Sequence, residues 1–96
     1  MISRELHVAI EIWVRADTWH TSHPCDDERF YALLAVVEFE GAHNFDVDGF
    51  IDVASELANR YHPRMKREFI SENIKDKALQ AEAIMGYIAF RRRHQI

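Results

Sequence analysis

The sequence predicts an all-α fold, a small four-helix bundle built as one domain over residues 1–96. Apolar residues recur at the three- and four-residue spacing of a helix in four segments. Pro24, Gly41 and Pro63 stand between these segments, and residues that cap helices stand where the apolar stripes begin. Only three glycines and two prolines occur in the whole chain, so we expect no flexible linker.

The first segment, residues 4–19, fits two periodicities. As a β-strand it would alternate Leu6, Val8, Ile10, Ile12 and Val14 with the residues between them. On a helical wheel the same segment separates into an apolar face and a polar face. The apolar face holds Leu6, Ala9, Ile10, Trp13 and Ala16, and the polar face holds Arg4, His7, Glu11 and Arg15. Ser3 can cap the helix and Glu11 can pair with Arg15, so we expect the central helix of the bundle, with a strand over residues 6–14 as the alternative.

The next two helices are indicated by their caps. Residues 18–25 lack periodicity and contain Pro24, which predicts a loop, and Asp26 or Asp27 can then cap a helix that Gly41 ends. The apolar stripe of this helix is Phe30, Leu33, Leu34 and Val37. Asp46 or Asp48 can cap the third helix. Its expected buried stripe is Phe50, Ile51, Ala54, Leu57, Ala58 and Tyr61.

The last helix is expected to begin near Pro63 or Ser71 and to run as far as Arg93. Its expected buried residues are Phe69, Ile70, Ile74, Ala78, Ala81, Ile84, Met85 and Ile88. A start at Pro63 would place three basic residues, Arg64, Lys66 and Arg67, in the first turn. The helix dipole disfavours positive charge there by up to about 1 kcal/mol each. We therefore expect compensating negative charge from the acidic half of this chain, from a neighbouring chain or from a polyanion.

The charges are distributed unevenly along the chain. The net charge of −4 combines a balance of −9 over residues 1–59 with a balance of +5 over residues 60–96. This asymmetry predicts a homodimer in which opposite halves pair, and the alternative is that the two halves of one chain neutralise each other. Cys25 cannot form an internal disulfide, which predicts a reducing, cytoplasmic location. Polar residues interrupt every apolar run, so we expect no membrane insertion.

Two segments contain metal-ligating residue types. His20, His23 and Cys25 precede three acids, although their spacing matches no zinc motif, and a polar loop before a helix cap explains them as well. Residues 44–52 resemble the calcium loop of EF-hand proteins over its first nine positions. Position twelve is Ser55 instead of the bidentate glutamate, which favours an acidic helix cap. A metal-responsive regulator that uses either segment is therefore the second functional hypothesis.

The leading hypothesis is a protein-interaction module without enzymatic activity. No catalytic or cofactor motif is present, so neither an enzyme nor a cofactor is expected. Eleven aromatic residues exceed what a small bundle can bury, and three lie off the apolar stripes: Trp19, Tyr31 and Phe39. Together with six acids at two helix starts, they are the predicted surface for a partner protein with a basic surface: Asp26, Asp27, Glu28, Asp46, Asp48 and Asp52. Immunity proteins and mobile-element inhibitors are of this general type.

The third hypothesis is a nucleic-acid-binding protein. Its candidate basic patch comprises Arg60, Arg64, Lys66, Arg67, Arg91, Arg92 and Arg93. The sequence pI of about 5.8 disfavours it, because a nucleic-acid-binding domain is usually basic over the whole fold. The terminal arginines also suit a helix C-terminus, where the dipole favours cations.

Overall fold

The computed structural model describes residues 1–94 and contains four α-helices in the expected order. These are α1 (Arg4–Arg15), α2 (Glu28–Gly41), α3 (Val47–Tyr61) and α4 (Arg67–Arg93). Two short 3-10 helices, η1 (Pro24–Asp26) and η2 (Ala42–Asn44), flank α2. No β-strand occurs among the described residues. The prediction of an all-α bundle is confirmed, and the strand alternative for residues 6–14 is wrong.

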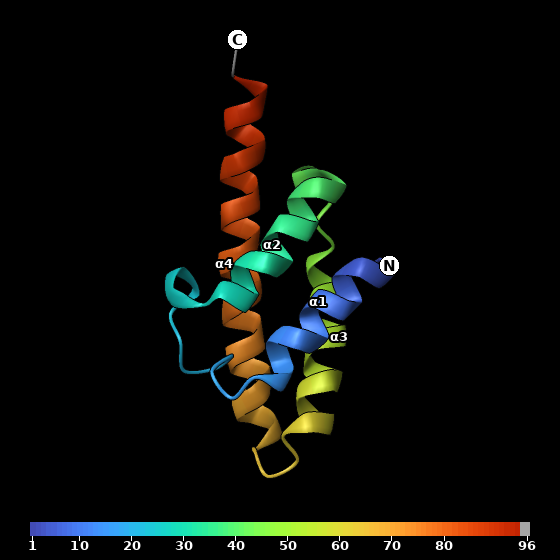
Figure 1. Cartoon of the computed structure of the whole chain (residues 1–96), viewed down its shortest axis with the longest axis vertical. Helices are drawn as coiled ribbons and strands as arrows, with labels where there is room; N and C mark the ends of the chain where they lie inside the picture. Colours follow the sequence, from blue (N-terminus) through green and yellow to red (C-terminus); the bar gives the residue numbers. More distant parts are fainter. Residues whose placement is uncertain (95–96) are drawn as a thin grey trace.

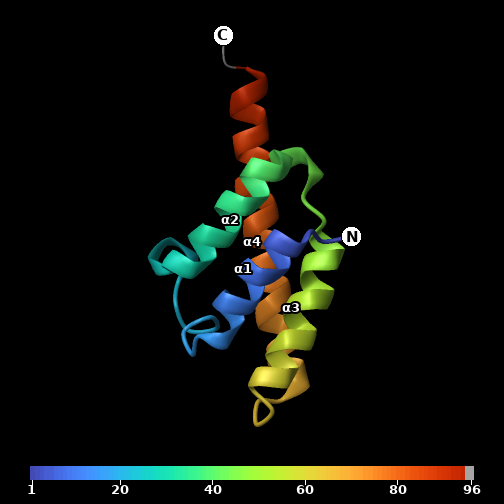
Figure 2. The same cartoon turned by 45° about the vertical axis from the view of Figure 1, so that its right-hand side comes forward.

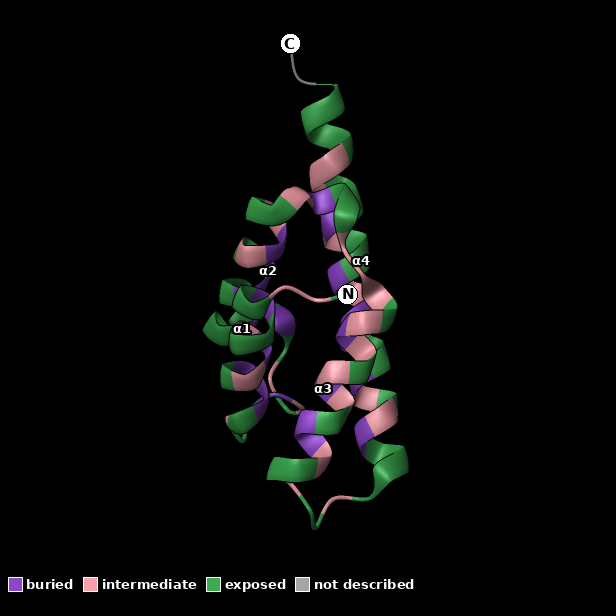
Figure 3. Cartoon of the chain, turned by 90° about the vertical axis from the view of Figure 1, so that its right-hand side faces the viewer, coloured by how far each residue is buried: buried purple, intermediate pink, exposed green. Residues whose placement is uncertain are grey.

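The helices form two layers. α1 and α2 run antiparallel in one layer, while α3 and α4 run side by side and antiparallel in the other (Figure 1, Figure 2). Figure 3 shows that the buried residues of the two layers face each other. The C-terminal end of α4 projects beyond the other helices (Figure 1), and the molecule is correspondingly elongated, at 50 × 25 × 20 Å.

Helix α1 begins at the expected residue and ends at Arg15. The Ser3 side chain accepts a hydrogen bond from the Leu6 amide at 3.1 Å, and the helix stops where Ala16 adopts an extended conformation. The loop predicted from residue 18 therefore begins slightly earlier, at Ala16. One side of α1 is buried, comprising Leu6, Ile10, Trp13 and Val14. Val8 and Ile12 are exposed on the other side, so α1 is not the central helix.

Tyr61 links α1 to the end of α3. Its hydroxyl donates a hydrogen bond to the Glu11 carboxylate at 2.8 Å, and the Arg15 guanidinium lies 5.3 Å from its ring centroid. The expected ion pair between Glu11 and Arg15 does not form among the described residues, because both side chains turn toward Tyr61. This contact keeps Tyr61 at the surface, contrary to the prediction that it is buried.

Trp13 lies at the centre of the core. Its ring centroid is 6.0 Å from that of Trp19, 5.3 Å from that of Phe30 and 5.8 Å from that of Phe50. The indole N–H donates to one carboxylate oxygen of Asp27 at 3.0 Å. The other oxygen accepts from two backbone amides in the first turn of α2, at 3.0 and 3.3 Å. Three donors therefore satisfy a carboxylate that is only 6% exposed.

Gly41 ends α2 as expected. Its φ of 109° lies in the left-handed region, which residues with a side chain rarely adopt. A β-carbon at this position would also lie 2.9 Å from the Asn44 side-chain nitrogen. Glycine therefore permits the abrupt change of direction from α2 into η2.

Helix α4 begins at Arg67, so both expected starts, Pro63 and Ser71, are wrong. Pro63 lies in the turn between α3 and α4, and Lys66 occupies the N-cap without a side-chain hydrogen bond. Most of the expected conflict between basic residues and the helix dipole is thereby removed, because Arg64 and Lys66 precede the helix. None of the helices within residues 1–94 is both long and apolar enough to cross a membrane.

The contact between Trp13 and Asp27 yields a stability prediction. Replacing Asp27 with alanine should lower the free energy of unfolding by about 2 to 4 kcal/mol, because a helix cap is lost and a buried indole N–H is left without an acceptor. Urea denaturation followed by tryptophan fluorescence would measure this loss. Asp26→Ala is the matched control, since this neighbouring carboxylate is exposed and should change stability by no more than about 0.5 kcal/mol.

Candidate functional site

The six acids of the predicted partner surface fall into two separate groups. Asp26, Asp27 and Glu28 lie at the start of α2, and the other three lie at the start of α3. The fourteen residues of α2 separate the groups by about 21 Å at 1.5 Å per residue. They therefore do not form one continuous acidic surface.

Two of these acids serve the fold. Asp27 is buried against Trp13, so its assignment to a partner-binding surface is wrong. Asp46 caps α3 by accepting from the Gly49 amide at 2.9 Å, and the α-amino group of Met1 lies 2.8 Å from the same side chain. Hydrogen bonds from that amino group and from the Gly49 amide lower the pKa of Asp46 below its ordinary value. The acids that remain exposed are Asp26, Glu28, Asp48 and Asp52.

The structure does not support either metal hypothesis. Residues 47–52, which would form most of a calcium loop, lie in the first turns of α3, so the resemblance to the EF-hand loop does not extend to its conformation. In the other segment, the His23 ring accepts a hydrogen bond from the Cys25 amide at 3.1 Å, and Cys25 is exposed. Across residues 1–94, no three histidine, cysteine or acidic side chains lie close enough together to hold a metal ion.

Residues 16–23 form a loop that packs one large side chain inward, while Asp17, Thr18, Thr21 and His23 are exposed. The Trp19 side chain is completely buried in the core, so the prediction that it belongs to a contact surface is wrong. His20 lies between the rings of Trp19 and Phe69, with centroids 5.1 and 5.6 Å away. The buried Lys77 amine donates to the Ser22 carbonyl at 2.9 Å and ties the loop to α4.

Two nitrogens of this loop are buried without a hydrogen-bond partner among the described residues, the Trp19 indole nitrogen and Nδ1 of His20. Burial is the largest cause of a lowered pKa at His20, and the nearby His62 and Lys77 lower it further against the opposing effect of Asp17. The uncharged form of His20 is therefore favoured in the folded protein.

The exposed aromatic residues of α2 lie on one side of that helix. Phe39 is 92% exposed and Tyr31 is 50% exposed, which confirms that both are at the surface. They share the outer side of α2 with Glu28, Ala32 and Ala35, which are also exposed. The opposite side is the buried stripe of Phe30, Leu33, Leu34 and Val37.

A second set of exposed apolar residues was not predicted. Leu79, Tyr87 and Phe90 are more than half exposed on α4, and Phe69, expected in the buried stripe, is also exposed. The wheel of residues 67–93 carries apolar side chains on two opposite sides, and this pattern is the signal by which the second face could have been found.

The predicted basic patch is divided between the two ends of α4. Arg60, Arg64, Lys66 and Arg67 lie at or near the turn before this helix, and the other three arginines lie at its far end. Arg92 pairs with Glu38 of α2 at 2.6 Å, and Arg91 donates to the Tyr87 hydroxyl at 3.2 Å. These separated groups do not form the continuous basic surface that a nucleic-acid backbone requires.

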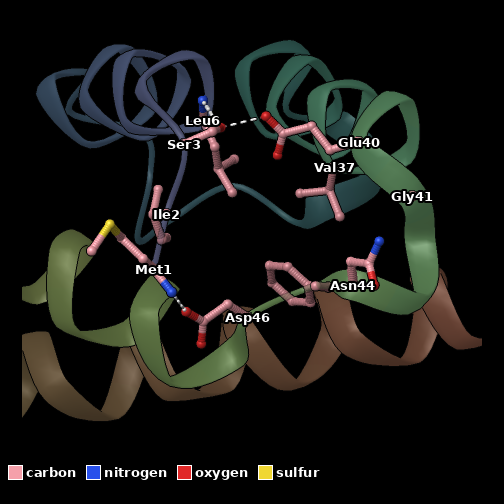
Figure 4. A pocket seen from close by; sticks show the side chains of 10 residues that line it. Met1, Ile2, Ser3, Leu6, Val37, Glu40, Gly41, Asn44 and Asp46 are labelled. Carbon is pink, nitrogen blue, oxygen red and sulfur yellow. Dashed lines mark hydrogen bonds and ion pairs between the residues drawn. The ribbon is translucent and has the colours of Figure 1, made fainter.

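One cavity lies between the start of α1, the end of α2 and the start of α3 (Figure 4). Its volume is about 30 Å³, which is room for about one water molecule. Wider hollows of about 260 to 400 Å³ lie open at the surface, including one between η2 and the end of α4 and one along the first turns of α4. The polar groups at its rim bind one another, because the Ser3 hydroxyl donates to Glu40 and the Met1 amine contacts Asp46.

Comparison of the chain with protein-family models, curated proteins and solved structures finds no match.

The environment of His20 predicts a pH-dependent stability. Above pH 6.5, the ordinary pKa, neither the folded nor the unfolded state holds the proton, and the contribution of His20 to stability is complete. As the pH falls through 6.5 toward the lower folded-state pKa, the unfolded state takes up the proton first and stability is lost. Urea denaturation at pH values between about 7.5 and 5 should show a smaller loss for His20→Gln than for the wild type. Identical pH profiles would contradict the assignment.

Proposed function

We propose that this chain is a protein-interaction module without enzymatic activity, and that it binds a partner protein through the outer face of α2. The observation that carries the proposal is Phe39, a large aromatic side chain that is 92% exposed on a helix whose other side is fully packed. Exposing such a ring to water is unfavourable by about 2 kcal/mol relative to burying it. A partner that covers the ring would recover that free energy.

The neighbours of Phe39 suit a protein contact. Ala32 and Ala35 are exposed between Phe39 and Tyr31, so the centre of the face is flat and the two rings project at its edges. Aromatic side chains that enter a pocket on a partner contribute a large share of the binding free energy in many interfaces. A flat centre with projecting rings matches that arrangement.

The charge on this face indicates the chemistry of the partner. Asp26 and Glu28 are exposed at the start of α2, about 17 Å along the helix from Phe39. We expect a partner with an apolar pocket for the phenylalanine and basic side chains at that separation. Such complementarity accelerates association and selects the partner more than it adds affinity.

The proposal extends to the setting in which the chain works. We propose that it acts as an inhibitor or binder of the immunity-protein or mobile-element-inhibitor type, that it is a homodimer, and that it resides in the cytoplasm. The exposed free thiol of Cys25 is consistent with a reducing compartment.

A photo-crosslinking experiment in the native host would test the α2 face. A photoreactive phenylalanine at position 39 should crosslink one partner protein, whereas the same group at the exposed His7 of α1 should not. With the purified partner, Phe39→Ser should raise Kd at least about thirtyfold, as expected for loss of a buried aromatic anchor. Glu28→Gln should raise Kd only about two- to threefold, and more at low salt than at high salt.

Val8→Ser is the matched control for Phe39→Ser, because Val8 is an exposed apolar residue of α1 and lies outside the proposed face. It should leave Kd unchanged. Equal affinities of the wild type and Phe39→Ser for the crosslinked partner would refute the proposed surface.

A further inference from the structure

The outer face of α4 carries large apolar side chains that the remainder of residues 1–94 leaves more than half exposed. Leu79 and Tyr87 are each 61% exposed and Phe90 is 56% exposed. The buried residues of α4 occupy the opposite side of the helix: Ile70, Ile74, Lys77, Ala78, Ala81 and Met85. Soluble proteins rarely leave a continuous apolar stripe exposed unless something binds it.

The spacing of the exposed residues is that of a coiled coil. Leu79, Ala83, Gly86 and Phe90 follow one another at intervals of four, three and four residues, and all four are exposed. Asp76 lies three residues before Leu79, and Arg93 lies three residues after Phe90. Both are also exposed. We name these six positions the α4 seam. The seam is apolar at its centre and carries an acid at one end and a base at the other.

We propose that a second copy of this chain occupies the α4 seam, with the two α4 helices packed antiparallel about a twofold axis. This inference rests on the homodimer proposed above and names its surface. In an antiparallel pair, Leu79 faces Phe90 of the other copy and Ala83 faces its Gly86. Asp76 then faces Arg93 of the other copy at both ends of the interface.

The charges decide the orientation. A parallel pair would place Asp76 against Asp76 and Arg93 against Arg93, and like charges in direct opposition destabilise an interface. The antiparallel pair replaces both repulsions with ion pairs. Within the described chain Asp76 accepts a hydrogen bond from Gln80 at 2.9 Å, and the neighbouring arginines are already bound, Arg92 to Glu38 and Arg91 to Tyr87.

Gly86 supports a close approach of two helices. Glycine inside a helix is unfavourable relative to alanine, and a β-carbon at position 86 would meet nothing within 4 Å among residues 1–94. No contact in this described part of the chain therefore requires glycine. Opposed to Ala83 of a second copy, Gly86 lets the helix axes come close at the centre of the seam while Leu79 and Phe90 fill the space on either side.

The projecting end of α4 leaves room for this arrangement. The seam lies on the opposite side of α4 from the core, and the C-terminal end of the helix projects beyond the other helices (Figure 1). Its contact with α2, between Arg92 and Glu38, lies on another side of the helix from the seam. The α4 helix of a second copy can therefore lie along it without meeting the remainder of the bundle. The paired stretch, residues 76–93, is about 27 Å long.

Sedimentation equilibrium over about a hundredfold range of protein concentration tests the inference. The wild type should dimerise reversibly, and Leu79→Glu should raise the dimer Kd at least about tenfold. Gly86→Gln should also weaken the dimer, whereas at concentrations well below the dimer Kd its thermal stability should equal or exceed that of the wild type, because glutamine is the better helix former. Phe39→Glu on α2 is the matched control and should leave dimerisation unchanged.

A charge exchange tests the orientation. Asp76→Arg alone should weaken the dimer about fivefold, and the double variant Asp76→Arg/Arg93→Asp should restore it. Failure of the double variant to restore the dimer overturns the antiparallel arrangement.

The outcomes separate this inference from the proposed function. A dimer that Leu79→Glu and Gly86→Gln do not weaken overturns the α4 seam and leaves the homodimer standing. A wild type that stays monomeric overturns both the homodimer and the α4 seam as its surface. The same holds if Leu79→Glu abolishes binding of another protein, because the seam would then have a different occupant. Neither result affects the α2 face, which is tested by the crosslink at position 39.

Discussion

The hydrogen bond between the Trp13 indole and the Asp27 carboxylate is the contact on which the arrangement of this bundle depends. It joins the last turn of α1 to the first residue before α2, and the same carboxylate caps α2. The Trp13 ring also contacts aromatic side chains from the loop, from α2 and from α3. One residue pair therefore joins α1 to α2 and packs this layer against α3. Phe39 points outward because it lies on the side of α2 opposite the stripe that this packing buries.

The sequence was sufficient for features that follow local rules. Ser3, Asp27, Gly41 and Asp46 stand at helix ends because each satisfies backbone groups or a backbone angle within a few residues of itself. The apolar stripe of α2 was predicted for the same reason, since helical spacing is visible in a short segment. The order of the four helices and the absence of strands within residues 1–94 followed from these signals.

The features that were missed depend on contacts between distant segments. Trp19 lies in a loop without periodicity, and its burial depends on His62 and α4, which the sequence does not place beside it. Asp27 was recognised as a cap, but its second partner lies fourteen residues away in the chain. In α4, apolar residues on both sides of the helix gave no single preferred face. The charge asymmetry is partly resolved inside the chain, since Arg92 of the basic half pairs with Glu38 of the acidic half.

The bond between Lys77 and the Ser22 carbonyl has a consequence for how the chain assembles. It joins residues 55 positions apart, whereas the contacts within the α3–α4 pair close much shorter stretches of chain. Long chain closures cost more entropy than short ones and form after them. The α3–α4 hairpin can therefore form without residues 16–23. These residues, in contrast, can become ordered only after α4 has formed. The conformation of this early loop is therefore held by a residue 55 positions further along the chain.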